Sequence, residues 1–289
     1  VMLAGAIRGY ACRYGVMAGR SAVLATCHDG TYDDAIMLAR LGMEITLIDA
    51  RNKPSRRAKE AQAAGIDVLS GRVPVNVAGV KSVAALEIAE IDEAGEISDN
   101  TTIIGCDLVG VSGGYSPVIH LPSHLGIKPR WEASINAFVT GKTTENIYMV
   151  GSADGIYDHQ ACLDHALQVT QKIKGEKTET KPRRRIPGGM RALFEVQITG
   201  RKLKSFIDPQ HDVTSEDVRQ AHREGFVSVE HMKRYTTLGM ATDQGRVGNV
   251  LGLAVMAEAQ GLAVGTSGVT TFRPPYTPVS IGALAARER

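Results

Sequence analysis

The sequence predicts an α/β protein in which a nucleotide-binding type of domain precedes a small helical domain. Residues 21–49 have the pattern of a strand, a helix and a second strand, and residues 174–187 form a charged, proline-bearing stretch typical of a linker. Helix start signals then recur between residues 212 and 263. The 289 residues are enough for about two domains.

Composition narrows the possible functions. Hydrophobic residues make up 43% of the chain and charged residues 22%, which is the balance of an ordinary globular protein. A formal net charge of +2 gives no reason to expect a nucleic acid or an acidic membrane surface as partner. No apolar run approaches the roughly 20 residues of a membrane span. The apolar start, Val1–Ala6, lacks a basic leader, and we interpret it as part of an interior helix.

Residues Ser21–Asp49 predict one βαβ unit. Ala22–Thr26 is a short buried-strand run, Thr31–Leu41 has helical spacing that Gly42 ends, and Glu44–Asp49 is the next strand. An acidic residue at the end of the second strand completes the outline of a dinucleotide fold.

The first turn of this unit, Thr26–Tyr32, lacks the glycines that such a fold uses to approach a pyrophosphate. Only Gly30 is present, and three larger side chains would obstruct the ligand: those of His28, Asp29 and Tyr32. We therefore expect the fold without a nucleotide at this turn. Asp49 is then expected to be a strand-end cap rather than a ribose ligand.

Further elements follow from the same patterns. We expect a helix near Arg56–Ala64, a strand at Asp67–Ser70, a hairpin or meander within Val73–Ile91, and a strand that enters a glycine turn at Cys106–Gly114. Asn146–Gly155 is predicted as another strand with a glycine turn, and a helix is predicted from about Tyr157 to Lys174.

The helical domain carries capping signals. Thr214 is predicted to be a helix N-cap, with Asp217 three residues on as a capping-box variant, and Gly225 closes that helix. Ser228 is predicted to cap a second helix through Tyr235, and Asn249–Ala263 has the spacing of a third.

Cysteines and histidines give no sign of a metal centre. Cys12, Cys27, Cys106 and Cys162 form no CxxC pair, so we interpret them as packed side chains, and free thiols suit the cytoplasm. His120 and His124 are four residues apart, but the intervening Pro122 and Ser123 argue against one helical turn that carries both.

The turn Val150–Gly155 resembles the second flavin or nucleotide motif of the glutathione-reductase family. In that family small residues let backbone at a helix N-terminus meet a phosphate or ribose. An ordinary strand–helix turn is the alternative. Val109–Pro117 resembles the glycine turn by which that family returns from its inserted nucleotide domain to its first one.

Four longer strings resemble the alpha subunit of heterotetrameric sarcosine oxidase: Asp107–Leu121, Phe206–Thr214, Glu230–Gln244 and Phe272–Pro278. This resemblance implies glutathione-reductase-like nucleotide-binding domains followed by a small helical domain. The expected parts are the end of a first nucleotide-binding domain (1–20), an inserted Rossmann-like domain (21–128), the return segment of the first domain (129–175), a linker with the helical domain (176–265) and the start of a folate-binding, aminomethyltransferase-like domain (266–289). The amino-terminal fingerprint and most of the folate domain have no counterpart, so we expect a fragment that is inactive alone.

The resemblance also implies chemistry. The expected activity is oxidative demethylation of sarcosine to glycine, with the one-carbon unit passed to tetrahydrofolate and oxygen reduced to hydrogen peroxide. The implied partners are beta, gamma and delta subunits. The implied cofactors are NAD, FMN at the subunit boundary, FAD in the beta subunit and tetrahydrofolate in the missing domain. The residues carried over for NAD are Gly151, Ala153, Asp154 and Gly155; those for the FMN phosphate are Lys233, Arg234, Thr236 and Thr237.

Three alternatives stay open at this point. The chain could belong to an N-methylglutamate dehydrogenase, to an opine or amine oxidase, or to a non-catalytic scaffold subunit. The helical domain also resembles ferredoxin-associated domains that hold a [2Fe–2S] cluster through four cysteines. Since residues 202–263 contain none, we expect no iron there.

Overall fold

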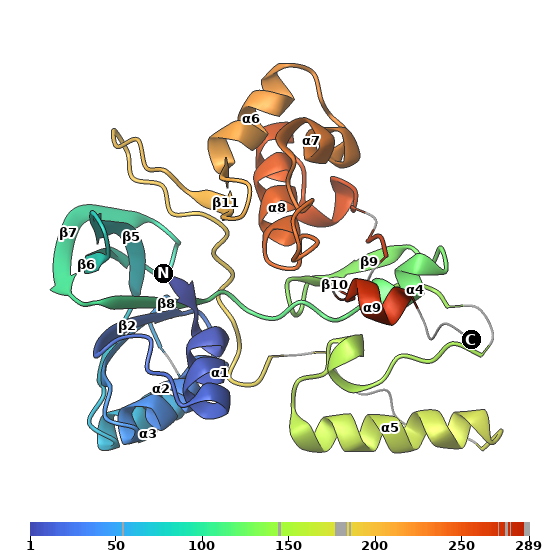
Figure 1. The fold of residues 1–289 in the computed structure, drawn as a ribbon, viewed down its shortest axis with the longest axis horizontal. Helices are drawn as coiled ribbons and strands as arrows, with labels where there is room; N and C mark the ends of the chain where they lie inside the picture. The colour runs from blue at the N-terminus through green and yellow to red at the C-terminus, as the bar shows by residue number, and fades with distance from the viewer. Residues whose placement is uncertain are drawn as a thin grey trace. The chain divides into compact units, whose positions relative to one another are not determined.

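The computed structural model describes residues 1–53, 55–143, 146–176, 184, 186–270, 272–274, 277 and 279–285. The chain divides into two compact units, one of Val1–Tyr115 with Arg185–Leu203 and one of Ser116–Arg184 with Lys204–Arg289 (Figure 1). We call them unit 1 and unit 2 and treat each by itself.

Unit 1 is built on a parallel sheet in the order β1-β8-β2-β3-β4. The strands are β1 (Met2–Leu3), β8 (Leu108–Ser112), β2 (Ser21–Thr26), β3 (Glu44–Asp49) and β4 (Asp67–Ser70), and the helices are α1 (Ala4–Tyr14), α2 (Gly30–Arg40) and α3 (Arg57–Ala63). The predicted βαβ unit, the helix near residues 56–64 and the strand at residues 67–70 are confirmed.

Both faces of this sheet are covered, because successive side chains of a strand point to opposite sides. Leu24 and Leu47 pack with Ile7 and Leu38 of the helices. Their chain neighbours Val23 and Ile48 pack on the other face with residues of an antiparallel meander (Figure 1). The two-sided burial explains why β2 has the sequence of a continuous apolar run.

The meander consists of β5 (Arg72–Gly79), β6 (Val83–Ile91) and β7 (Ile97–Gly105) in the order β5-β6-β7. The sequence predicts its first two strands within Val73–Ile91, and these are confirmed. The third strand is missing from the prediction, since its isoleucines, Ile97, Ile103 and Ile104, do not alternate with polar residues and none of its residues is buried.

Residues 186–203 also belong to unit 1, although the sequence assigns this part of the chain to the linker and helical domain. Most of the expected linker, residues 177–183 and 185, lies outside the described residues. The part that follows packs through Met190, Leu193 and Val196 against buried side chains of the sheet and meander. These apolar residues form no helix or strand, so no periodicity in the sequence reveals them.

Unit 2 begins with α4 (His120–His124) and a hairpin of β9 (Pro129–Glu132) and β10 (Ala137–Thr140). The prediction that Pro122 prevents a helix between the two histidines is wrong. Pro122 is the third helical residue, where the backbone N–H needs no partner within the helix.

A short 3₁₀ turn, η1 (Gly151–Asp154), and the long helix α5 (His159–Ile173) follow. The helix confirms the prediction, but the strand expected before Gly151 does not form at residues 146–150. A strand requires a hydrogen-bonded neighbour, and the described residues supply none for this segment.

The helical part of unit 2 contains β11 (Phe206–Asp208), β12 (Val213–Thr214), α6 (Ser215–Arg223), α7 (Val229–Thr236), α8 (Gly248–Gln260), η2 (Val264–Thr266) and α9 (Ile281–Leu284). Val218, Met232, Leu238 and Leu253 are buried in its core. The three predicted helices are confirmed. None of the helices in the described ranges combines the length and the apolar character that crossing a membrane requires.

The capping box is also confirmed. The Thr214 hydroxyl accepts the Asp217 N–H at 3.3 Å, and the Asp217 carboxylate accepts the Thr214 N–H at 2.8 Å. Ser228 occupies the corresponding N-cap position of α7, but its side chain makes no capping hydrogen bond.

This difference yields a prediction. Thr214→Ala should lower the free energy of unfolding by about 1 kcal/mol, because it removes a capping acceptor. Ser228→Ala, the matched control, should change it by less than about 0.5 kcal/mol. Urea denaturation of both variants measures the difference, and equal losses would contradict it.

Candidate functional site

In the first βα turn of unit 1, the side chain of a histidine binds the backbone at the start of the helix. His28 is fully buried; its Nδ1 accepts the Gly30 N–H at 3.0 Å, and its Nε2 lies 2.9 Å from the Ser112 hydroxyl. Burial, aided by the nearby Arg51 charge, lowers the pKa of His28 to about 4. A neutral imidazole thus accepts the N–H at the start of α2, the hydrogen bond that a phosphate oxygen makes in nucleotide-binding domains.

A buried charge network lies beside this turn. The Arg51 guanidinium contacts Asp49 at 2.7 Å and Asp29 at 2.9 Å. The Oδ1 of Asp49 accepts the Arg51 backbone N–H at 2.9 Å, and its Oδ2, which also contacts the guanidinium, accepts the Tyr32 hydroxyl at 2.8 Å. Asp49 therefore caps its strand end, as expected, and its carboxylate is fully used by protein donors.

Residues 186–191 cover the same edge of the sheet. The carbonyl groups of Gly188 and Gly189 accept hydrogen bonds from Arg51 at 3.0 and 3.2 Å, and the Arg191 N–H donates to the Cys27 carbonyl at 3.0 Å. The Tyr115 hydroxyl lies so close to Gly30 that no Cβ would fit between them. The protein's own groups fill the space in front of α2.

The network leads to a stability prediction. Arg51→Met should lower the free energy of unfolding by about 3–5 kcal/mol, because it leaves the buried Asp49 carboxylate and the half-buried Asp29 carboxylate without their cation. The control is Arg56→Met, since the Arg56 side chain is 88% exposed in its pair with Glu60 and should contribute less than about 1 kcal/mol. Chemical denaturation of the full chain compares the two, and a small loss for Arg51→Met would show that the network is dispensable.

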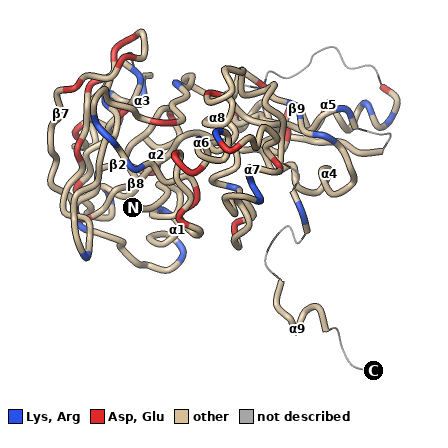
Figure 2. Tube along the Cα trace, turned by 90° about the horizontal axis from the view of Figure 1, so that it is seen from above, with Lys and Arg blue, Asp and Glu red and all other residues tan. Residues whose placement is uncertain are grey.

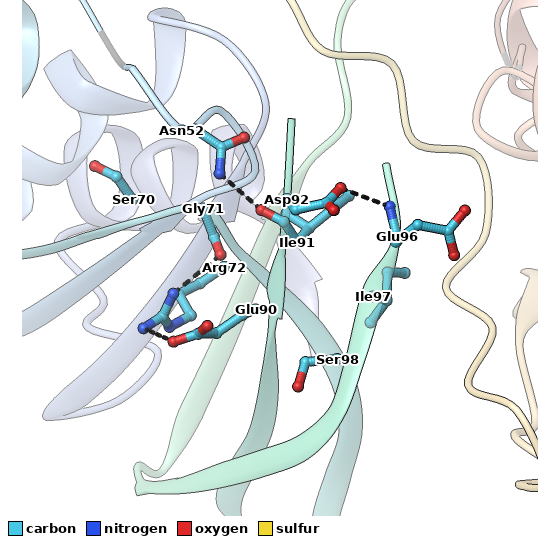
Figure 3. Close-up of a pocket in the computed structure, with 10 residues that line it drawn as sticks. All are labelled: Asn52, Ser70, Gly71, Arg72, Glu90, Ile91, Asp92, Glu96, Ile97 and Ser98. Carbon is cyan, nitrogen blue, oxygen red and sulfur yellow. Dashed lines mark hydrogen bonds and ion pairs between the residues drawn. The ribbon is translucent and has the colours of Figure 1, made fainter. Parts of the chain in front are cut away.

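A cavity of about 400 Å³ lies after the carboxyl end of β4, bordered by the meander (Figure 3). Its polar groups bind one another: Arg72 contacts Glu90 at 2.7 Å, the Asn52 amide donates to the Ile91 carbonyl at 2.7 Å, and Asp92 accepts the Glu96 N–H at 2.9 Å. No motif in the sequence marks its ten lining residues as a binding site, and the mutual pairing of their polar groups gives no reason to assign a ligand.

The predicted NAD residues lie together in η1 and its C-cap. Gly155 has a φ of 78°, and a Cβ there would lie 2.6 Å from Ile135 Cδ1, so packing already requires glycine. The Asp154 carboxylate is paired with Arg184 at 2.6 Å. Asp154 and Gly155 are buried, whereas Gly151 and Ala153 are partly exposed.

The helix after this turn begins later than the motif implies. Asp158 is its N-cap and accepts the Ala161 N–H at 2.9 Å, so the helix start is already capped by the protein. The accessible face of the turn is its backbone from Gly151 to Ala153.

The predicted FMN residues lie at the C-terminal end of α7. Burial lowers the pKa of Lys233; Glu230 opposes this shift, whereas the charges of Arg273 and Arg234 add to it. Figure 2 shows Lys and Arg segments beside α7. Arg234 also forms an ion pair with Glu230 at 3.7 Å, and the charge of Asp243 opposes those of the two arginines. The positive side chains suit an anion, because a negative group among them would relieve their repulsion.

The two threonines differ from each other. The Thr236 hydroxyl donates to the Met232 carbonyl at 2.9 Å and accepts the Leu238 N–H at 3.3 Å, so it shapes the end of the helix. Thr237 is exposed and is the C-cap, with a φ of 63°. Lys233, Arg234 and Thr237 thus fit an anion better than Thr236 does.

Sequence reasoning missed two residues of this neighbourhood. Arg273 acts on Lys233 through its charge. Asp208, only 3% exposed, holds the segment after α7 by a hydrogen bond to the Gly239 N–H. Asp208 could have been found from its position at the end of a short strand directly before a turn. No local sequence pattern identifies Arg273. In the part of the chain that the structure describes, no group of three or more His, Cys, Asp or Glu is placed to hold a metal ion.

Comparisons with known proteins agree with the sequence resemblance. Residues 202–288 match the family model of the sarcosine oxidase A3 domain. The whole chain is 36% identical to 31% of the sarcosine oxidase subunit alpha of Corynebacterium sp. (strain P-1). The corresponding subunit of Rhizobium meliloti (strain 1021) is 36% identical over 98% of this chain and 28% of its own length. The chain therefore spans about a third of the length of the relatives that it matches.

The fold has a counterpart among solved structures. The L-proline dehydrogenase from P. horikoshii superposes with a TM-score of 0.63 over 96% of this chain and 52% of that chain, at 19% sequence identity. The predicted α/β class is confirmed. Over the segment that it spans, this chain belongs to the sarcosine oxidase alpha subunit family.

Proposed function

We propose that this chain is part of the alpha subunit of a sarcosine oxidase. The reaction would convert sarcosine to glycine, pass the one-carbon unit to tetrahydrofolate and reduce oxygen to hydrogen peroxide. The observation that carries the proposal is the 36% identity to a sarcosine oxidase alpha subunit along the full chain. We infer that beta, gamma and delta subunits complete a cytoplasmic heterotetramer, with FAD in the beta subunit and tetrahydrofolate in a domain beyond this segment.

Within this scheme unit 2 binds cofactors rather than the amine. We propose NAD at the η1 turn, held through the backbone of Gly151 and Ala153, while Asp154 and Gly155 shape the turn. The small side chains on the exposed face favour a close approach of the ligand.

We propose the FMN phosphate at the end of α7. Lys233 and Arg234 would supply charge-assisted hydrogen bonds, Thr237 a hydroxyl donor, and Thr236 the local helix ending. When bound, the flavin would carry electrons from the amine-oxidising centre to oxygen. The contribution of this chain is to bind and orient the flavin at a subunit boundary.

A scaffold role is the second candidate, and it applies to unit 1. The closed first turn, with His28 and Arg51 in the place of a ligand, favours a structural task for this Rossmann-like domain.

The test is to produce the complete alpha subunit with its three partners and to measure oxygen consumption with sarcosine. N-methylglutamate and an opine serve as competing substrates. Sarcosine should be turned over with the highest kcat/KM, and peroxide should form in equal amount to the oxygen consumed. A preference for another amine would replace the proposed substrate, and no turnover of any amine by an intact, flavin-loaded complex would overturn the proposed activity.

The NAD turn has its own prediction. Ala153→Glu should weaken NAD binding about tenfold or more, because a carboxylate on the exposed face repels the pyrophosphate at close range. Ala166→Glu, on the exposed side of α5, is the control and should leave the affinity unchanged. Titration of NAD into the complete complex measures both. Gly155 is unsuitable as a probe because a side chain there would collide with Ile135.

A further inference from the structure

We propose that Asp208 is a positioning residue for the anion-binding end of α7. Its carboxylate fixes the chain that leaves α7, and thereby the placement of Lys233, Arg234 and Thr237. This inference rests on the flavin-phosphate role proposed above for those residues.

Asp208 ends β11 and is nearly fully buried. Its Oδ1 accepts the N–H groups of Gln210 at 3.0 Å and of His211 at 3.4 Å. Its Oδ2 accepts the Gly239 N–H at 2.9 Å. One carboxylate thus joins the turn after β11 to the segment after α7, two parts of the chain that are 31 residues apart.

Two outer contacts strengthen the same connection. The His211 ring Nδ1 lies 3.1 Å from the Thr237 carbonyl, and the Thr242 hydroxyl donates to the Gln210 side chain at 2.9 Å. Both involve exposed residues, where water competes for the hydrogen bonds. The Asp208–Gly239 hydrogen bond is buried, so of the three contacts it contributes most to holding the segment after α7 in place.

The segment that Asp208 holds has an unusual backbone. Thr237 has a φ of +63°, a region that a β-branched residue rarely adopts, and Gly239 follows with a φ of +66°. Strain of this kind persists only where surrounding contacts fix it. Because Thr237 is the C-cap of α7, release of Gly239 would let the last helical turn relax and would move the cations on it.

The direction in which the FMN affinity changes tests the proposal. Asp208→Asn removes a negative charge from the neighbourhood of the proposed phosphate. If the charge alone mattered, FMN would bind more tightly. If position matters, FMN should bind more weakly, since an amide cannot accept hydrogen bonds on both sides.

The experiment uses the complete complex, prepared free of flavin. FMN and riboflavin are titrated separately, because only FMN has the phosphate. Asp208→Asn should weaken FMN about tenfold, the effect of losing one hydrogen bond to a charged group, and leave riboflavin unchanged. Asp212→Asn removes the same charge from an exposed position in the same turn and should change neither affinity.

Two further measurements separate the possible failures. Lys233→Ala tests the phosphate site itself: if FMN affinity is unchanged, the proposed site is wrong and the role of Asp208 falls with it. If Lys233→Ala weakens FMN but Asp208→Asn does not, only the positioning role is wrong. Equal losses for FMN and riboflavin would reveal a general structural role and would also overturn it.

A second variant covers the case in which Asp208→Asn does not fold. His211→Ala removes the exposed contact to Thr237 and should weaken FMN about threefold with no effect on riboflavin. Hydrogen exchange of the Gly239 amide gives a readout without flavin. It should accelerate in Asp208→Asn, while amides in the middle of α8 stay protected. Unchanged exchange at Gly239 would contradict the proposal.

Discussion

The ion pair between Arg51 and Asp49 is the interaction on which the arrangement of unit 1 depends. It lies at the carboxyl edge of the sheet, with Asp49 completely buried and Arg51 nearly so. The same guanidinium reaches Asp29 in the first turn and two carbonyl groups of residues 188 and 189. Because a buried charge is costly without partners, this one group ties β3, the first βα turn and a distant segment into one structure.

The network has a functional consequence. In nucleotide-binding domains the same edge offers helix N–H groups and an acidic side chain to a ligand. Here the His28 ring accepts the helix N–H, and the guanidinium of Arg51 binds the acidic side chain, Asp49. The fold is retained while its usual ligand contacts are made internally. We therefore propose the cofactor sites in unit 2, at the η1 turn and at the end of α7.

In unit 2, hydrogen bonds between short segments, rather than a large sheet, fix where the helices begin and end. Capping by Thr214 and Asp158 sets where α6 and α5 begin, and Asp208 controls the chain after α7. The core residues Met232, Leu238 and Leu253 bury the inner faces of the helices. Apolar packing therefore fixes the helices as bodies, and the polar contacts fix their ends, where charged side chains are exposed.

Local signals in the sequence determined the individual elements. Apolar runs, helical spacing and caps correctly placed β2, α2, β3, β4 and the helices α5, α6, α7 and α8 of unit 2, because each depends on residues close in the chain. Two of the failures have long-range causes: residues 146–150 lack a strand neighbour among the described residues, and residues 186–203 pack within unit 1 without a pattern. The failures at β7 and α4 are local, since β7 has no apolar alternation and Pro122 lies in the first turn of α4. Only the tertiary structure decided that residues 188 and 189 meet Arg51, that Arg273 acts on Lys233 and that Asp208 holds Gly239. Such contacts join residues far apart in the chain, and no local pattern of residue types encodes them.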